Sequence, residues 1–218
     1  MQLLLVGLAL RLVFDSDASI ALSLAWIVAM ILFAAGVTRR RAPEVPGLGI
    51  VAAMAFAAVA ALGIGLLFGL RILPFEARTL VPMAGLAIGN SMNATILTAR
   101  RMVDGLRDKR PEVEARLALG QTGTAATRPV ARSAVRTALV PQIETTKAVG
   151  IVFLPGAMTG LILAGVAPLQ AVLVQAVVMY LVLGSAATSS VLTSIGVLRR
   201  LVTRDHRLTR LARPADSG

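Results

Sequence analysis

The sequence predicts an all-α protein, a polytopic bundle of transmembrane helices, and two observations support this. First, 56% of the 218 residues are hydrophobic and only 15% are charged, whereas about 25% of a soluble domain is charged. Second, the apolar residues form long blocks without any charge, at 18–37, 45–70, 79–99 and 148–198. One membrane span needs about 20 apolar residues, so each block is long enough to cross a bilayer.

We expect about six spans, at 1–14, 19–38, 45–70, 79–99, 148–166 and 169–198. The last uncharged block holds two of them, joined by a turn near Val166. The first span is anomalous, because 14 helical residues extend about 21 Å and a hydrocarbon core is about 30 Å thick. We therefore expect that a further N-terminal helix is missing from this chain or that its start is assigned late.

Most of the positively charged residues lie between or after these spans. The net charge is +11, and 19 of the 22 Lys and Arg residues fall in three clusters, at 39–41, 100–147 and 199–213. Pairs of spans separate the clusters, so all three can lie on one side. This pattern is typical of cytoplasmic loops in a bacterial cell membrane and disfavours a nucleic-acid-binding patch. Both termini are then cytoplasmic, and the basic tail 199–218 can bind anionic headgroups.

The segment 100–147 is the one sizeable loop between spans. Pro111 suits the first turn of a helix, Glu112 and Glu114 suit the positive end of its dipole, and Gly120 suits its C-terminal cap. A second helix is expected at 129–139. Pro141, just beyond this range, is expected to stop or kink the helix. Such a pair can lie on the membrane surface or in a groove of a partner protein.

Several stretches of the sequence resemble one transporter family. They are "LALG" at 117–120, "RTALVP" at 136–141, "PMAGLAIGNSMNA" at 82–94 and "GIVFLPGAMTGLILAGVAP" at 150–168. Over residues 2 to about 201 the chain resembles the FetB-type ABC transporter permeases, which are known as iron exporters. Ala157 departs from the family's usual methionine, and Glu144 stands where the family varies between Asn and Asp. Family chains begin about one helix earlier and have seven spans, in agreement with the short first span.

The resemblance implies the permease subunit of an ABC transporter, which exports iron or another metal ion. It implies two permease chains, two separate ATPase subunits that bind ATP and magnesium, and no cofactor on this chain. The residues agree that ATP binds elsewhere, because neither Lys109 nor Lys147 follows a glycine as a phosphate-binding loop requires. The alternatives are a permease for another substrate such as a nucleotide sugar, and a channel or scaffold without an energy source. An enzyme is disfavoured, because no acid–base or metal constellation assembles.

By the same resemblance, the helix 111–119 and the helix after it form the element that couples to the ATPase. Its polar rim comprises Glu112, Glu114, Arg116, Arg132 and Arg136. Leu117 and Leu119 form its apolar anchor, and Gly120 ends the first helix. The alternative is a solvated or lipid-surface loop.

Polar side chains inside the spans are candidates for the transport path, because they usually face the bundle interior. The candidates are Asn90, Ser91, Met92, Asn93, Glu144, Thr145, Thr146, Lys147, Met158, Thr159 and Gln175. Glu144 is expected at the cytoplasmic mouth of its span, where it can instead pair with Lys147. Ordinary interhelical hydrogen bonding is the alternative for the others, and no spacing indicates a fixed metal site.

The glycine-rich stretch 150–165 suits only a membrane helix, because glycine and proline destabilise helices in water. Small residues four apart, at 65–69, 85–89 and 156–160, predict close helix packing. We expect Pro155, Gly156, Gly160 and Gly165 to form a weakened helix segment that flexes during transport.

Overall fold

The described part of the chain, residues 19–150 and 154–201 in a computed structural model, contains helices and no β-strand. The predicted span 1–14 and the tail beyond Leu201 lie outside it. The helices are α2 (Ser19–Arg41), α3 (Leu48–Gly69), α4 (Ala77–Asp108), α5 (Arg110–Ala118), α6 (Gly123–Ala148), α7 (Gly156–Leu163) and α8 (Pro168–Leu201). By length and composition α2, α3, α4 and α8 can each cross a membrane. The predicted all-α membrane bundle is therefore confirmed.

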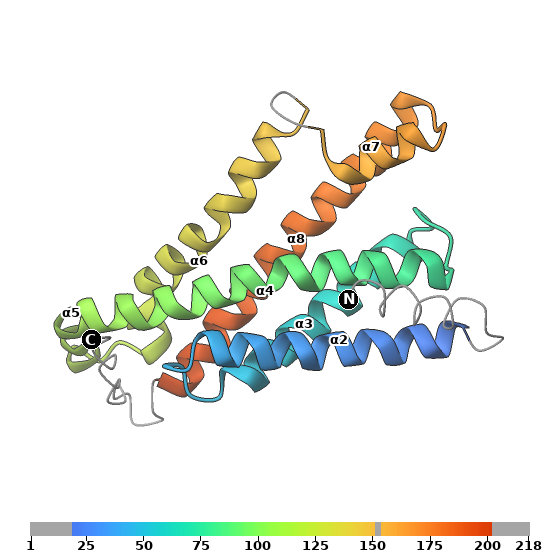
Figure 1. The fold of residues 1–218 in the computed structure, drawn as a ribbon. Helices are drawn as coiled ribbons and strands as arrows, with labels where there is room; N and C mark the ends of the chain where they lie inside the picture. The colour runs from blue at the N-terminus through green and yellow to red at the C-terminus, as the bar shows by residue number, and fades with distance from the viewer. Residues whose placement is uncertain (1–18, 151–153, 202–218) are drawn as a thin grey trace, which may run out of the picture.

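The long helix α4 is the centre of the bundle and packs on α2, α3, α6 and α8. In Figure 1 it runs the length of the molecule, with α2 and α3 on one side and α6 on the other. Its uncharged residues 79–99 extend about 31 Å, which matches a hydrocarbon core of about 30 Å. The charges at Arg78 and Arg100 therefore bracket the membrane-embedded part of α4.

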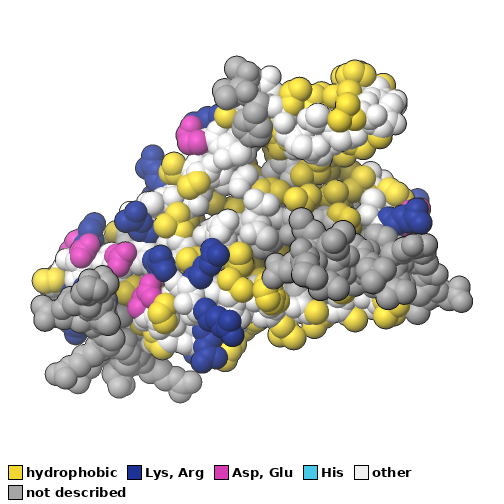
Figure 2. All heavy atoms as spheres, viewed as in Figure 1, with side chains coloured by type: hydrophobic (Ala, Val, Ile, Leu, Met, Phe, Trp, Pro, Cys, Tyr) yellow, Lys and Arg dark blue, Asp and Glu magenta, His cyan; other side chains and the backbone are white. Residues whose placement is uncertain are grey.

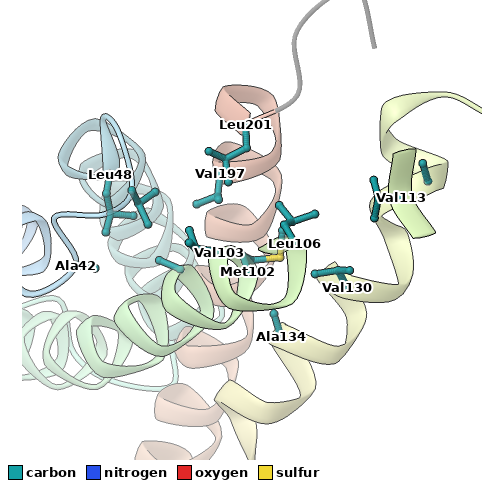
Figure 3. Packing of buried hydrophobic residues seen from close by; sticks show 13 residues of the cluster. Ala42, Leu48, Met102, Val103, Leu106, Val113, Val130, Ala134, Val197 and Leu201 are labelled. Atoms are coloured by element: carbon teal, nitrogen blue, oxygen red, sulfur yellow. The ribbon is translucent and has the colours of Figure 1, made fainter. Parts of the chain in front are cut away.

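Two apolar clusters hold the bundle together. One joins α2, α3 and α4 through side chains such as Ile27, Phe56 and Ile88. The other lies at the end where α2, α4 and α8 carry most of their arginines, which we call the arginine-rich end. It joins the α2–α3 turn to α4, α5, α6 and α8 through residues that include Met102 and Val113 (Figure 3). Burial of apolar side chains thus fixes α5 and the first half of α6 to the bundle.

The predicted span 148–166 is wrong, because this crossing is discontinuous. Helix α6 ends at Ala148, Val149 is extended, and Gly150 has a left-handed backbone with φ of +83°. After residues 151–153, Pro155 is again extended and precedes α7, which has only eight residues. Proline disfavours the helical conformation in the residue before it, and glycine adopts a positive φ without steric strain. These two residue types therefore break the helix that composition alone suggested.

The predicted end of the second loop helix near Pro141 is also wrong. Helix α6 begins at Gly123, where the Thr122 side chain caps it by accepting a hydrogen bond from the Ala125 N–H. It then continues through both Pro129 and Pro141 to Ala148. Membrane helices tolerate proline because neighbouring groups satisfy the freed backbone. One helix therefore joins the arginine-rich end to the membrane-embedded region.

Of the glycines in the three predicted patterns, Gly85 packs closely within the described chain, since an added Cβ would lie 3.1 Å from Met30 Cε, but most do not. An added Cβ at Gly65, Gly69, Gly89, Gly156 or Gly160 would meet no atom within 4 Å. These glycines lie on outward faces. Close approach occurs instead at Gly105, where the Cβ would lie 2.8 Å from Val130, and at Gly196, where it would lie 2.4 Å from Val51.

Candidate functional site: a polar cavity and an arginine groove on one helix

A small open cavity, lined by both polar and apolar side chains, lies between α4, α6 and α8. Its volume is about 140 Å³. Its lining residues are Asn90, Asn93, Ala94, Leu97, Ala138, Pro141, Gln142, Thr145 and Ala186. The Asn90 amide nitrogen donates to the Leu86 carbonyl at 2.8 Å, and the Thr145 hydroxyl donates to the Pro141 carbonyl at 2.9 Å. Both side chains thus keep an oxygen lone pair available to a ligand in the cavity.

The cavity lies at membrane depth. Asn93 is seven residues from Arg100 and fifteen from Arg78 along α4. These separations correspond to about 10 Å and about 22 Å of helix. The cavity therefore sits inside the hydrocarbon layer, in the half nearer the arginine-rich end. Amide and hydroxyl oxygens at this depth can take the place of water around a cation.

The structure brings together three of the predicted path residues, Asn90, Asn93 and Thr145. Met92 is half-buried and packs against the apolar cluster of α2, α3 and α4. Met158 and Thr159 lie on α7, where the Thr159 hydroxyl donates to the Pro155 carbonyl at 3.1 Å. None of these three lines the cavity.

Gln175 is buried on α8, with 7% of its surface exposed, and its side-chain oxygen has no hydrogen-bond partner among the described residues. It does not line the cavity either. Its burial agrees with the expectation that polar side chains in a span turn inward. Its place in a path stays a prediction.

The predicted position of Glu144 at the mouth of a span stays a prediction. Glu144 adjoins Thr145, which lines the cavity together with Asn93. The expected pairing does occur: its carboxylate lies 3.0 Å from the Lys147 ammonium. Both charges lie on α6, which continues past the expected helix end at Pro141 to Ala148.

A band of hydroxyl groups lies between α4 and α8, and of its members the sequence had indicated only Ser91. The buried side chains are Ser91, Thr95, Thr98, Ser185, Ser189, Ser190, Thr193 and Ser194. Two long contacts cross the interface: Ser189 Oγ to the Ser91 carbonyl and Thr193 Oγ1 to Thr95 Oγ1, both 3.5 Å. The signal was present, since Ser185, Ser189 and Thr193 recur every four residues and so share a face of α8.

At the arginine-rich end, α5 and α6 form a basic groove of about 520 Å³. Its lining residues are Arg116, Ala125, Arg128, Pro129, Arg132, Ser133 and Arg136. Arg128 was not predicted, although it is four residues from Arg132 and therefore on the same face. On α5, Arg116 pairs with Glu112 and Arg110 pairs with Glu114, each at 2.7 Å. The three α6 arginines are exposed, which leaves the groove free for an anionic partner.

The tip of α5 presents one leucine and not the predicted two. Leu117 packs against the apolar cluster at the arginine-rich end, whereas Leu119 is 82% exposed. Gly120 has φ of +83° and donates to the Leu117 carbonyl, while the Gln121 N–H bonds the Arg116 carbonyl. This is the glycine cap that the sequence predicted for the helix end. It follows directly after Leu119, which stays exposed at the end of α5.

These features together define a multi-pass helical membrane protein with a polar cavity inside the bilayer and a basic tip outside it. The model of the "Uncharacterised protein family (UPF0014)" matches residues 1–202, and the chain belongs to this family.

Relatives named in this family include plant and bacterial proteins. The chain is 38% identical to "UPF0014 membrane protein STAR2" of Oryza sativa subsp. japonica over 89% of its length and 68% of the relative's. It is 36% identical to "Protein ALUMINUM SENSITIVE 3" of Arabidopsis thaliana, over 88% of this chain and 70% of that one. It is 28% identical to "Probable iron export permease protein FetB" of Escherichia coli, over 95% of this chain and 80% of the relative's. These matches confirm the FetB-type resemblance. No solved structure gives a significant match.

Proposed function

We propose that this chain is the membrane-spanning permease subunit of an ABC transporter for a metal cation, with iron export as the first candidate. The substrate and direction come from the name of the FetB relative. The Arabidopsis relative also carries a metal, aluminium, in its name. ATP and magnesium bind a separate ATPase subunit, which docks at the tip formed by α5 and the start of α6.

The observation that carries this proposal is the continuity of α6. The helix bears the basic groove at Arg128 to Arg136 and the cavity wall at Pro141 and Thr145. It is 26 residues long, or about 39 Å, and has no break between the two sites. A partner that moves the tip therefore displaces the cavity wall, as a rigid helix shift would require.

The size of the cavity favours an ion over a nucleotide sugar. Pockets for drug-sized ligands measure about 300–1,000 Å³, and this cavity holds about 140 Å³. One water occupies about 30 Å³ in the liquid, so the space suits a cation with a few waters. Neutral oxygens from Asn90, Asn93 and Thr145 would coordinate it loosely, which allows release.

The orientation follows from the charge. The arginine-rich end faces the cytoplasm by the positive-inside rule, and this is where an ATPase subunit has access to ATP. The docking contact then combines the exposed Leu119 as apolar anchor with the surrounding arginines as polar rim.

The test is uptake into inverted membrane vesicles that contain this chain and its ATPase subunit. We expect ATP-dependent accumulation of radiolabelled iron, and none with an ATPase subunit that lacks its phosphate-binding lysine. Uptake of UDP-glucose in place of metal would show a different substrate. Flux that needs neither ATP nor the ATPase subunit would show a channel and contradict the proposal.

A further inference from the structure

We propose that a pocket between α4 and α6 binds the headgroup of a membrane phospholipid that carries both a phosphate and a primary amine, as phosphatidylethanolamine does. We call it the α4–α6 pocket, and its volume is about 170 Å³. It lies apart from the cavity beside Asn93, with which it shares only Ala138's neighbours on α6 and no lining residue. The inference does not depend on ATP or on transport.

The α4–α6 pocket lies at the level of lipid headgroups. The uncharged residues of α4 end at Ala99, and the pocket residues Arg101 and Asp104 follow two and five positions later. These positions are about 3 Å and about 8 Å further along the helix. The headgroup layer on each side of a hydrocarbon core is about 5–8 Å thick. Both side chains therefore begin within the layer that holds lipid phosphates and amines.

Two cations, one carboxylate and two hydroxyl groups line this pocket. Arg101 and Asp104 lie on α4, and Lys109 follows it directly. The hydroxyls belong to Ser133 and Thr137, which are four residues apart and so share one face of α6. None of the five side chains has a hydrogen bond or an ion pair within the described chain. All five are therefore open to a ligand.

The charges of the pocket match both ends of the proposed headgroup. The phosphate can accept hydrogen bonds from the Arg101 guanidinium and the Lys109 ammonium, and such charge-assisted bonds are strong. The primary ammonium of the lipid can then donate to the Asp104 carboxylate. Basic pockets between membrane helices on the cytoplasmic side are known to bind lipid headgroups, and the carboxylate adds a place for an amine.

The same residues disfavour two other common headgroups. Phosphatidylglycerol has no cation, so it would leave the Asp104 carboxylate unpaired beside a phosphate. The quaternary ammonium of phosphatidylcholine has no N–H to donate, and aromatic rings are its usual binding partners. No aromatic residue lines the α4–α6 pocket. Specificity for a primary amine follows from what the other lipids leave unpaired.

A bound headgroup would join two helices that already lie close together. At the pocket wall an added Cβ on Gly105 of α4 would lie 2.8 Å from Val130 of α6. A headgroup that contacts Arg101 and Ser133 bridges these helices in the folded protein only. Because a ligand that binds only the folded state stabilises it, the lipid should raise the unfolding temperature.

The test measures lipid binding and thermal unfolding of the purified full chain in detergent. Short-chain phosphatidylethanolamine should raise the unfolding temperature and bind roughly tenfold more tightly than phosphatidylglycerol or phosphatidylcholine with the same acyl chains, since one charge-assisted bond separates them. Equal binding of the three lipids would overturn the proposal. Equal stabilisation by inorganic phosphate at the same concentration would also overturn it, because the pocket would then take a free anion.

Asp104→Asn tests the contact with the amine. This variant should lose the preference for phosphatidylethanolamine over phosphatidylglycerol and keep the unfolding temperature that the protein has without lipid. Asp108→Asn is the matched control, because Asp108 is also exposed on α4 but does not line the pocket. It makes the same change in charge and should keep the preference. A preference that survives Asp104→Asn, or that disappears equally in Asp108→Asn, would contradict the proposal.

Arg101→Gln tests the contact with the phosphate. Since all three lipids carry a phosphate, this variant should weaken the binding of each by roughly tenfold. Arg101→Lys keeps the positive charge and should restore part of the affinity. Unchanged phosphatidylethanolamine binding in Arg101→Gln would refute the assignment. None of these measurements includes the ATPase subunit or a metal, so they succeed or fail independently of the transport test.

Discussion

Asn93, like Gln142, lines the cavity with a side-chain amide that has no hydrogen-bond partner among the described residues. Its neighbour Asn90 donates to a backbone carbonyl, and Thr145 does the same. An asparagine with both groups free can present its oxygen to a cation and its nitrogen to water. We therefore expect Asn93 to contribute more to transport than Asn90 does.

The first prediction concerns this side chain. Asn93→Leu keeps the volume and removes the oxygen, and a contact with an ion contributes about 1.5–3 kcal/mol. ATP-dependent iron uptake in vesicles should fall roughly tenfold or more. Thr188→Val, which removes a hydroxyl from α8 outside the cavity, should leave uptake unchanged. Equal losses in both variants would show that the effect comes from helix packing.

The second prediction concerns the close approach of α3 and α8. A Cβ on Gly196 would lie 2.4 Å from Val51 Cγ1, and overpacking destabilises by about 1–3 kcal/mol. Gly196→Ala should therefore lower the thermal unfolding temperature of the purified protein in detergent. Gly65→Ala, where an added Cβ meets no atom within 4 Å, should not. An unchanged midpoint for Gly196→Ala would mean that the two helices separate easily.

Residue spacing predicted part of the site and not all of it. Asn90 and Asn93 are three apart, so the sequence could place them on one face of α4, and the structure confirms that they meet. Spacing could not tell that Met92 turns towards α2 and α3, because that depends on which helices surround α4. The same limit separates Leu117, which packs inward, from Leu119, which is exposed.

At the scale of elements, α6 shows where local rules fail. Proline normally ends a helix because it removes a hydrogen bond and clashes with the preceding turn, so an end at Pro141 was expected. The helix continues because it packs on α4 and α8, and the membrane offers the freed backbone no competing water. Glu144 and Lys147 consequently belong to the same helix as the arginines of the basic groove.

The third prediction concerns the tip of α5. If Leu119 anchors the ATPase subunit, Leu119→Ala should reduce co-purification of that subunit by roughly tenfold, since a buried leucine contributes about 1.5–3 kcal/mol. Leu163→Ala removes an equally exposed leucine, 84% against 82%, from α7 at the other end of the molecule. That variant should bind the ATPase normally. If both variants bind the ATPase subunit normally, the contact lies elsewhere.

The fourth prediction concerns the orientation of the whole molecule. Basic side chains gather towards the α5 end in Figure 2, and the positive-inside rule places that end in the cytoplasm. Gln121→Cys beyond α5 should react with a membrane-impermeant maleimide in inverted vesicles only, and Leu73→Cys in the α3–α4 turn in intact cells only. The reverse pattern would exclude an ATPase at the tip.

The sequence by itself determined the class of the protein and the ends of most spans. Each span end depends on a local quantity, the free energy of moving one side chain from water into hydrocarbon, and runs of apolar residues followed by arginines report it directly. For this reason α2, α3 and α8 begin and end within a few residues of their predicted positions.

Only the tertiary structure decided where the predicted span 148–166 breaks and which polar groups share the cavity. These features depend on contacts between helices far apart in the chain. Asn93 and Thr145 are 52 residues apart and meet because α6 folds back along α4. Residue periodicity assigns a side chain to a face of its own helix, but only packing decides what that face meets.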